Sequence, residues 1–210
     1  MDPRFRRTRE RLRAALYELA AVRPVADVSV AELCRIAGIT RDTFYRHAKS
    51  PVDLLADFLG EEVAPITETR PEETASDRDI WTSMVAAETA LLEHVVARAA
   101  IYRNAMNPHL IAPLRDRLEA LIRDSLINRA NRRPEILPGA VAAAGQRGIE
   151  VAAASAAAGN IGAIEVWLRG RDLDISRDLG LILAAAPAFW WGTPPDDDPR
   201  DSRVSGSPIA

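Results

Sequence analysis

The chain has 210 residues, of which 48% are apolar, and its 27 basic and 30 acidic side chains leave a net charge of −3. This composition is typical of a globular protein of one or two domains, and it excludes a largely disordered chain. A single cysteine, Cys34, excludes an internal disulfide and suits a reducing cytoplasm.

The charges are distributed unevenly along the chain. Residues 1–50 contain 11 basic and 6 acidic side chains (+5), whereas residues 51–210 contain 16 basic and 24 acidic ones (−8). A basic N-terminal part on an acidic body is typical of a protein that binds nucleic acid with one face.

Neither a signal peptide nor a membrane helix is expected. The basic N-terminus is not followed by the apolar segment of a signal peptide. The longest uncharged stretches, 151–164 and 179–195, fall short of the roughly 20 apolar residues that a membrane span needs. We therefore expect a cytoplasmic protein with no membrane partner.

Two elements are expected before residue 23. Residues 1–7 form an arginine-rich arm that either reaches DNA or only adds solubility. A first helix is predicted over 8–22, because apolar residues recur on one face and the helix must end before Pro24 (the face comprises Leu12, Ala15, Leu16 and Leu19).

Residues 28–50 predict a helix-turn-helix. Ser29 and Glu32 form a capping box, and the helix that they begin ends at Gly38. Thr40 is a suitable N-cap for a second helix, two residues after that glycine. Two short helices joined by a glycine-containing turn form the motif whose second helix enters the major groove of DNA.

These residues resemble the N-terminal DNA-binding domain of the TetR/AcrR family of transcriptional regulators. The resemblance covers residues 8–59 and is carried by two runs, Ala37-Gly38-Ile39-Thr40 and Thr43-Phe44-Tyr45-Arg46-His47. Ala48 replaces the family's usual bulky apolar residue, and Pro51 replaces a lysine that contacts a phosphate. The resemblance implies a repressor that a small-molecule effector releases from its operator, and the alternatives are an activator or a regulator without a ligand. A two-fold dimer on a palindromic operator is expected, because one recognition helix reads too few base pairs for useful specificity.

The second motif helix carries the expected DNA contacts. Arg41 is placed to bond guanine, whereas Asp42 either accepts from cytosine or only stabilises the helix N-terminus. His47 is expected on a phosphate, the alternative being a partly buried structural imidazole. The candidate DNA-binding residues are Thr40, Arg41, Asp42, Thr43, Tyr45, Arg46, His47 and Lys49.

The rest of the chain predicts further helices and no strands, so the expected fold is all-α. Domain boundaries are expected at 1–60 for the helix-turn-helix domain and 61–192 for a C-terminal helical bundle, with a disordered tail at 193–210. The predicted helices start at Ser50-Pro51 and then cover 77–98, 99–106, 107–129, 140–169 and 176–189, with loops at 64–77 and 130–138.

An effector pocket is expected between the helices of residues 78–129. Its candidate residues combine aromatic, thioether and apolar side chains with one carboxylate, and the alternative is that they are ordinary core. Glu88 either faces an open cavity and favours a cationic or hydrogen-bond-donating ligand, or pairs with Arg115 or Arg123. The candidates are Trp81, Met84, Glu88, Leu91, Tyr102, Met106 and His109.

A homodimer interface is expected in residues 150–190. Two apolar stripes on the last long helices would form a four-helix interface between two subunits, and the alternative is that both stripes face their own domain's core. The predicted interface residues are Ile161, Ile164, Leu168, Leu179, Ile182, Leu183 and Ala186.

No enzyme class, cofactor or metal is expected. His47, His94 and His109 are scattered, and the single lysine, Lys49, follows no glycine-rich phosphate loop. A helix-turn-helix protein whose C-terminal domain only dimerises, without an effector, remains the alternative function.

Overall fold

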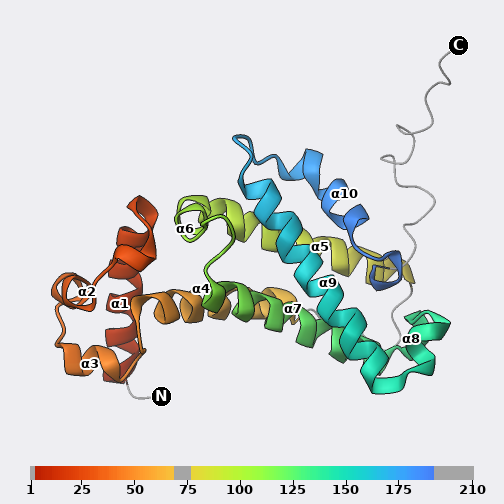
Figure 1. Cartoon of the computed structure of the whole chain (residues 1–210), viewed down its shortest axis with the longest axis horizontal. Helices are drawn as coiled ribbons and strands as arrows, with labels where there is room; N and C mark the ends of the chain where they lie inside the picture. The colour runs from red at the N-terminus through yellow and green to blue at the C-terminus, as the bar shows by residue number, and fades with distance from the viewer. Residues whose placement is uncertain (1–2, 69–76, 192–210) are drawn as a thin grey trace, which may run out of the picture.

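The computed structural model describes residues 3–68 and 77–191. Within these ranges the chain forms α-helices and short 3-10 helices and no strand, so the all-α prediction is confirmed. Figure 1 shows an elongated molecule with α1–α3 at one end and α8 at the other. The predicted tail, 193–210, lies outside the described residues.

Capping side chains fix the ends of the N-terminal helices. Ser29 accepts from the backbone N–H of Glu32 at the start of α2, and Thr40 accepts from Thr43 at the start of α3. Ser50 does the same for α4, accepting from the backbone N–H of Asp53. The N-terminal elements are α1 (Pro3–Val22), η1 (Val25–Asp27), α2 (Val30–Ala37), α3 (Arg41–Tyr45) and α4 (Pro51–Thr67).

The turn between α2 and α3 depends on glycine. Gly38 has a φ of +62°, and the backbone N–H of Ile39 bonds the carbonyl of Cys34 at 3.0 Å. Arg11 of α1 donates to the Gly38 carbonyl at 2.7 Å, which holds the turn against the first helix. The relative orientation of α2 and α3 therefore depends on one backbone conformation that glycine adopts most readily.

The helix α4 joins the two parts of the molecule. Its first half packs Leu54, Leu55 and Phe58 into the N-terminal core, and its second half crosses α7 (Figure 1). At this crossing a side chain at Gly60 would overlap Arg117. The apolar core consequently runs without interruption from α1 into the C-terminal body.

Two predicted boundaries near the N-terminal part are wrong. The helix α1 begins at Pro3, so most of the predicted arm is its first turns, because proline is favoured at a helix start. The predicted loop 64–77 begins too early, since α4 continues through Pro65 to Thr67. Pro65 lies in the last turn, and Ser125 of α7 donates to the Thr67 carbonyl at 2.5 Å.

The C-terminal body consists of six α-helices after α4 within the described residues. They are α5 (Asp77–Ala97), α6 (Ala99–Asn104), α7 (Ala112–Arg132), α8 (Gly139–Ala143), α9 (Gly145–Leu168) and α10 (Ile175–Ala185). The short 3-10 helix η2 (Pro134–Ile136) lies between α7 and α8, and η3 (Ala188–Trp190) follows α10.

Three helices of the body differ from the sequence prediction. Residues 107–111 form a turn, with a cis bond before Pro108, and α7 begins only at Ala112 and runs on to Arg132. The expected helix over 140–169 is divided at Gly145, whose φ is +58°. The last helix ends at Ala185, because Pro187 prevents its continuation.

The helix α9 is long and apolar enough to cross a membrane by length and composition alone. One side of it, which includes Ala153, Ile161 and Leu168, is buried in the body. Core helices of globular proteins meet the same length and composition criteria, and α9 packs against α7 and α10 as such a helix does.

Candidate DNA-binding surface and ligand cavity

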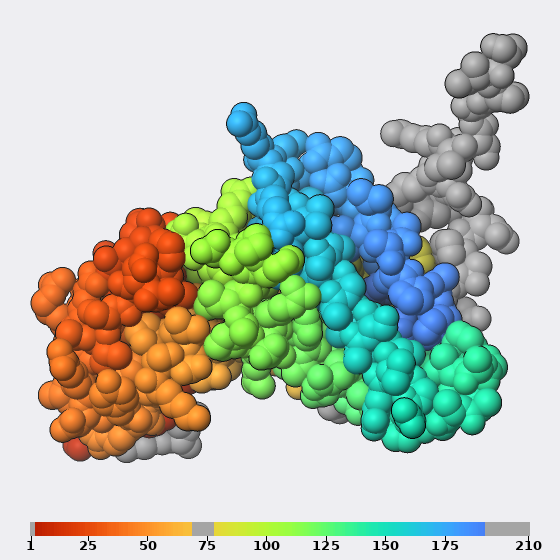
Figure 2. All heavy atoms as spheres, viewed as in Figure 1, coloured from red at the N-terminus to blue at the C-terminus, as the bar shows by residue number. Residues whose placement is uncertain are grey.

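The helix α3 presents most of its predicted contact residues to solvent. Arg41, Asp42 and Tyr45 are exposed, as are Arg46 and Lys49 just after the helix. Phe44 between them is fully buried and anchors the helix in the core. Figure 2 shows this segment at the end of the molecule farthest from α8. Exposed cationic and hydroxyl groups on a short helix suit both base edges and phosphates.

The two threonines of α3 also have structural roles. The Thr40 hydroxyl accepts from the backbone N–H of Thr43 at 3.2 Å and lies 2.9 Å from the Thr43 hydroxyl. Arg46 donates to the Thr43 hydroxyl at 3.4 Å. Thr40 therefore serves first as the N-cap, and a contact with DNA would be additional to that role.

His47 is half-buried and stacks on Phe5 of α1, with ring centroids 4.2 Å apart. Burial, followed by the nearby charges of Arg9 and Arg46, lowers the pKa of His47. Its Nδ1 has no hydrogen-bond partner within residues 3–68 and 77–191. A neutral imidazole suits a hydrogen bond to phosphate better than an ion pair with it.

The two departures from the family pattern are accommodated locally. Ala48 is half-buried and packs against the main core, so the smaller side chain does not leave the α3–α4 junction open to solvent. Pro51 is buried at the first position of α4, directly after the Ser50 cap. Proline is favoured at that position because no intrahelical N–H bond is lost.

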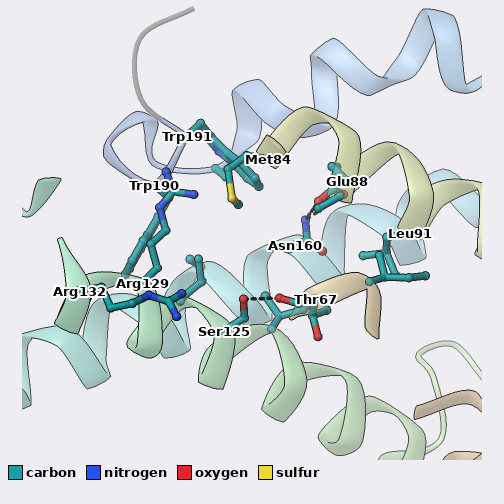
Figure 3. A pocket seen from close by; sticks show the side chains of 16 residues that line it. Thr67, Met84, Glu88, Leu91, Ser125, Arg129, Arg132, Asn160, Trp190 and Trp191 are labelled. Atoms are coloured by element: carbon teal, nitrogen blue, oxygen red, sulfur yellow. Dashed lines mark hydrogen bonds between the residues drawn. The ribbon is translucent and has the colours of Figure 1, made fainter. Parts of the chain in front are cut away.

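A cavity lies in the C-terminal body between α4, α5, α7, α9 and η3 (Figure 3). Its volume is about 70 Å³, compared with the roughly 10–15 Å³ that one water molecule needs. Its lining is mostly apolar, with a few polar groups. The lining residues are Ile66, Thr67, Met84, Ala87, Glu88, Leu91, Ile122, Ser125, Leu126, Arg129, Arg132, Ala156, Asn160, Ala186, Trp190 and Trp191.

Three of the seven predicted ligand residues line this cavity, namely Met84, Glu88 and Leu91. Leu91 is buried, and Met84 is half-buried at the Trp191 side (Figure 3). Because α5 carries all three on one face, the helical period identified them correctly as neighbours.

The other four predicted ligand residues lie elsewhere. Trp81 and Met106 are half-buried against the main core. Tyr102 is buried, and its hydroxyl lies 3.0 Å from Nε2 of His94. His109 is exposed, and its Nδ1 lies 2.8 Å from a carboxylate oxygen of Glu165. The turn at 106–111 therefore takes His109 and Met106 away from the cavity.

Glu88 has neither of the expected arginine partners. Both of its carboxylate oxygens accept from Nδ2 of Asn160 at 3.1 Å, and the side chain is buried. Burial raises the pKa of Glu88, although the bond from Asn160 opposes the shift. Arg115 instead pairs with Glu165 at 2.8 Å, and Arg123 with Asp124 at 3.5 Å.

Glu165 is the second buried carboxylate of the body, and it is fully paired. It accepts from Arg115, from the backbone N–H of Leu110 at 3.0 Å, and from His109 when that nitrogen is protonated. Burial alone would raise its pKa, but these hydrogen bonds outweigh the burial and lower it. Glu165 thus fixes the 106–111 turn to α9.

The sequence patterns did not reveal the polar residues that α7, α9 and η3 contribute to the cavity. Arg129 follows Leu118, Ile122 and Leu126 on one face of α7, a spacing that could have revealed it. Trp190 was missed because the last helix was expected to end just before it. Asn160 lay unrecognised inside an alanine-rich stretch.

The residues predicted to form the dimer interface face the protomer's own core and not its surface. All but one of these residues are buried within the protomer's own core, and Ala186 is half-buried, with the cavity beside it. The alternative interpretation applies, because an apolar stripe that is covered by its own domain cannot also meet a partner. The stripes are Ile161, Ile164 and Leu168 on α9, and Leu179, Ile182, Leu183 and Ala186 on α10.

The outward faces of α9 and α10 carry a different set of residues. Val151 and Val166 of α9 are 64% and 65% exposed, and Leu181 of α10 is 72% exposed. Between the two valines the exposed positions are small, including Gly159, at which a side chain would meet open space. Figure 2 shows both helices at the surface of one face of the molecule.

The described residues contain no cluster of three or more His, Cys, Asp or Glu side chains that could hold a metal ion. Cys34 is buried, and burial raises the pKa of its thiol, with Arg41 opposing. It packs in the core of the N-terminal part.

Comparisons with known proteins give matches in structure but not in sequence. No protein-family model matches the chain, and no curated protein matches its sequence. A solved TetR-family transcriptional regulator from Streptomyces coelicolor matches with a TM-score of 0.57 at 15% identity, over 94% of both chains. The dihydroxyacetone kinase operon activator DhaS matches with a TM-score of 0.55 at 16% identity, over 84% of this chain and 94% of its own.

Both matches are regulatory proteins, and both extend from the helix-turn-helix through the helical body. The resemblance seen in residues 8–59 therefore has a counterpart in the architecture of the whole chain. The protein has the fold of the TetR-family transcriptional regulators.

Proposed function

We propose that the protein is a dimeric, sequence-specific DNA-binding regulator of transcription, a cytoplasmic repressor that a small molecule releases from its operator. The proposal rests on one observation, that the single helix α4 joins the two candidate sites. Its first residues follow the exposed contacts of α3, and its last turn contributes Ile66 and Thr67 to the cavity wall.

A second contact route supports communication between the two parts. Tyr17 of α1 donates to Glu62 of α4 at 3.1 Å, and Arg98 at the end of α5 pairs with Glu62 at 2.7 Å. Asn104 of α6 donates to the carbonyl of Ala20 at 2.9 Å. A ligand that moves α5 relative to α4 would strain these contacts and shift the position of α1 and α3.

The dimer of this proposal uses the outward faces of α9 and α10. Exposed apolar side chains such as Val151, Val166 and Leu181 are unfavourable in water, and small residues between them permit close helix approach. A two-fold dimer gives each operator two recognition helices, which one short α3 requires for useful specificity.

The alternative function, a regulator whose body only dimerises, accounts less well for the cavity. A body that serves only as an interface has no need for buried polar groups around an open volume. Arg129 and Glu88, both buried at the cavity wall, favour a ligand-responsive protein.

The test is to select bound fragments from genomic DNA and to measure operator and random-DNA affinity in variants. Arg41→Ala removes a base contact, so operator affinity should fall by ~1–3 kcal/mol while random-DNA affinity changes little. Lys49→Ala removes a phosphate contact, so it should weaken both and reduce the salt slope by about one unit. If Arg41→Ala keeps full operator preference, α3 does not read bases.

A further inference from the structure

The cavity contains a buried cation that has no anionic partner among the described residues. Arg129 of α7 is only 7% exposed, and its Nε and Nη1 have no hydrogen-bond partner in the part of the chain that the structure describes. Burial, with the charges of Arg133 and Arg132 adding to it, lowers the pKa of Arg129 to about 10, so the group is still charged at neutral pH. A buried, unpaired guanidinium is unfavourable, so an anionic partner is expected.

The groups around Arg129 are also donors. The indole Nε1 atoms of Trp190 and Trp191 are buried and bond no acceptor within residues 3–68 and 77–191. Arg132, exposed at the margin of the cavity, adds a second positive charge. In Figure 3, Arg129 and Arg132 lie together near Trp190. This end of the cavity therefore offers several N–H donors to whatever occupies it.

The one carboxylate among the described lining residues does not meet this need. Glu88 is bonded to Asn160, and Figure 3 shows the pair at the other end of the cavity from Arg129. The uncompensated charge of the cavity is consequently positive. A positive cavity favours an anion, which differs from the cationic or hydrogen-bond-donating ligand that was one of the two sequence-based alternatives for Glu88.

We infer that the cavity binds a small organic monocarboxylate, whose carboxylate accepts from Arg129 and an indole N–H and whose apolar body lies against Met84, Leu91 and Leu126. A carboxylate matches the planar fork of guanidinium with two parallel hydrogen bonds. The walls away from Arg129 are mostly apolar, and the space is small. A phosphate monoester would bring a second negative charge that the buried groups do not neutralise.

This inference deepens the proposed function, since it names the chemical class of the effector. The inference depends on the proposed function only for the claim that the bound carboxylate changes DNA binding. Binding of the carboxylate itself is a property of the cavity and can be measured in the absence of DNA.

The experiment compares acids with their uncharged and cationic counterparts by titration calorimetry on the full chain. The probes are 3-phenylpropanoate, hexanoate and octanoate, each with its primary amide, together with 3-phenylpropylamine. At least one acid should bind about tenfold or more tightly than its amide, which corresponds to about 1.4 kcal/mol. The amine should bind more weakly than either.

Three arginine variants locate the effect. Arg129→Met keeps most of the side-chain length and removes the buried charge, so the acid should lose its roughly tenfold advantage over the amide. Arg132→Met is the matched control, because Arg132 is exposed and a solvated charge contributes little. Arg129→Lys keeps the charge without the fork, and an intermediate preference is expected.

Circular dichroism spectra and thermal midpoints close to those of the wild type confirm that each variant is folded. The inference is overturned if no acid binds more tightly than its amide, or if Arg129→Met keeps the preference.

Operator binding, measured on the same samples, separates this inference from the proposed function. If the protein binds its operator but prefers no acid, only the carboxylate inference fails. If an acid binds through Arg129 and no sequence-specific DNA binding is found, the proposed regulator fails while the site stands.

Discussion

At the scale of single residues, His94 links stability to pH. It is buried, its Nε2 lies 3.0 Å from the Tyr102 hydroxyl, and its Nδ1 lies 3.9 Å from Glu62. Burial, with Arg98 adding to it, lowers the pKa of His94 to about 4, although Glu62 opposes the shift. The folded state therefore favours the neutral ring, whereas the unfolded chain protonates near pH 6.5.

We predict that the protein loses stability as pH falls from 6.5 toward 4, through His94. Urea unfolding at pH 7 and pH 4.5 should show that the wild type loses about 2 kcal/mol more than His94→Gln. Glutamine keeps a hydrogen bond for Tyr102 but does not titrate. Equal losses in the two proteins would contradict a depressed His94 pKa.

The carboxyl group of Glu88 is expected to change the stability with pH in the opposite direction to His94. Its raised pKa means that the folded protein holds the proton more tightly than the unfolded chain. Stability from this group is therefore present at low pH and decreases as pH rises above the unfolded value, about 4.3. Glu88→Gln should be more stable than the wild type at pH 7, on the order of 1 kcal/mol, and this difference should diminish toward pH 4. A variant that is less stable at pH 7 would mean that the carboxylate has a stabilising partner.

At the scale of elements, the α2–α3 turn depends on the left-handed conformation of Gly38. Gly38→Ala introduces a side chain at a φ of +62° and directly against the guanidinium of Arg11. We predict a loss of about 1–2 kcal/mol in unfolding free energy and weaker operator binding, because α3 loses its fixed orientation.

Gly139→Ala is the matched control for this substitution. Gly139 begins α8, its φ is outside the left-handed region, and an added side chain there meets open space. Its unfolding free energy should be unchanged or raised by a few tenths of a kcal/mol. Chemical denaturation of both variants measures the difference, and equal values would refute the requirement for glycine at Gly38.

At the scale of the whole molecule, we predict that the inner faces of α9 and α10 stabilise the fold and that their outward faces form the dimer interface. Leu181→Asp and Val166→Asp place a charge on the outward faces. Both should remain folded, with thermal midpoints close to the wild type, yet sediment as monomers that lose operator affinity. Ile164→Asp, at a buried position, should instead destabilise the fold by several kcal/mol.

Sedimentation and circular dichroism together distinguish these results. If Leu181→Asp and Val166→Asp keep a dimer mass, the interface lies on another face. If Ile164→Asp remains fully folded, the apolar stripe of α9 does not carry the core packing that its burial indicates.

The sequence by itself determined the local features of this protein. Ser29, Thr40 and Ser50 were identified as caps, and each cap depends on a backbone N–H three residues away. Gly38 was identified as the end of α2 because this too is a local feature, in which the conformation of a single residue ends the helix. The exposed side of α3 followed in part, because a helix that buries Phe44 turns Asp42, two positions earlier, to the opposite side.

Only the tertiary structure decided what each apolar face covers and which charges remain unpaired. The stripe of Ile161, Ile164 and Leu168 shows the same helical period whether it packs in its own core or against a second subunit. Glu88 and Asn160 are 72 positions apart, and no spacing rule joins them. Arg129 lies on a helix that is polar overall, and it lines the cavity together with Trp190 of η3, which follows α10 at the end of the described chain. Such contacts depend on how distant elements pack, and the local order of residues does not contain that information.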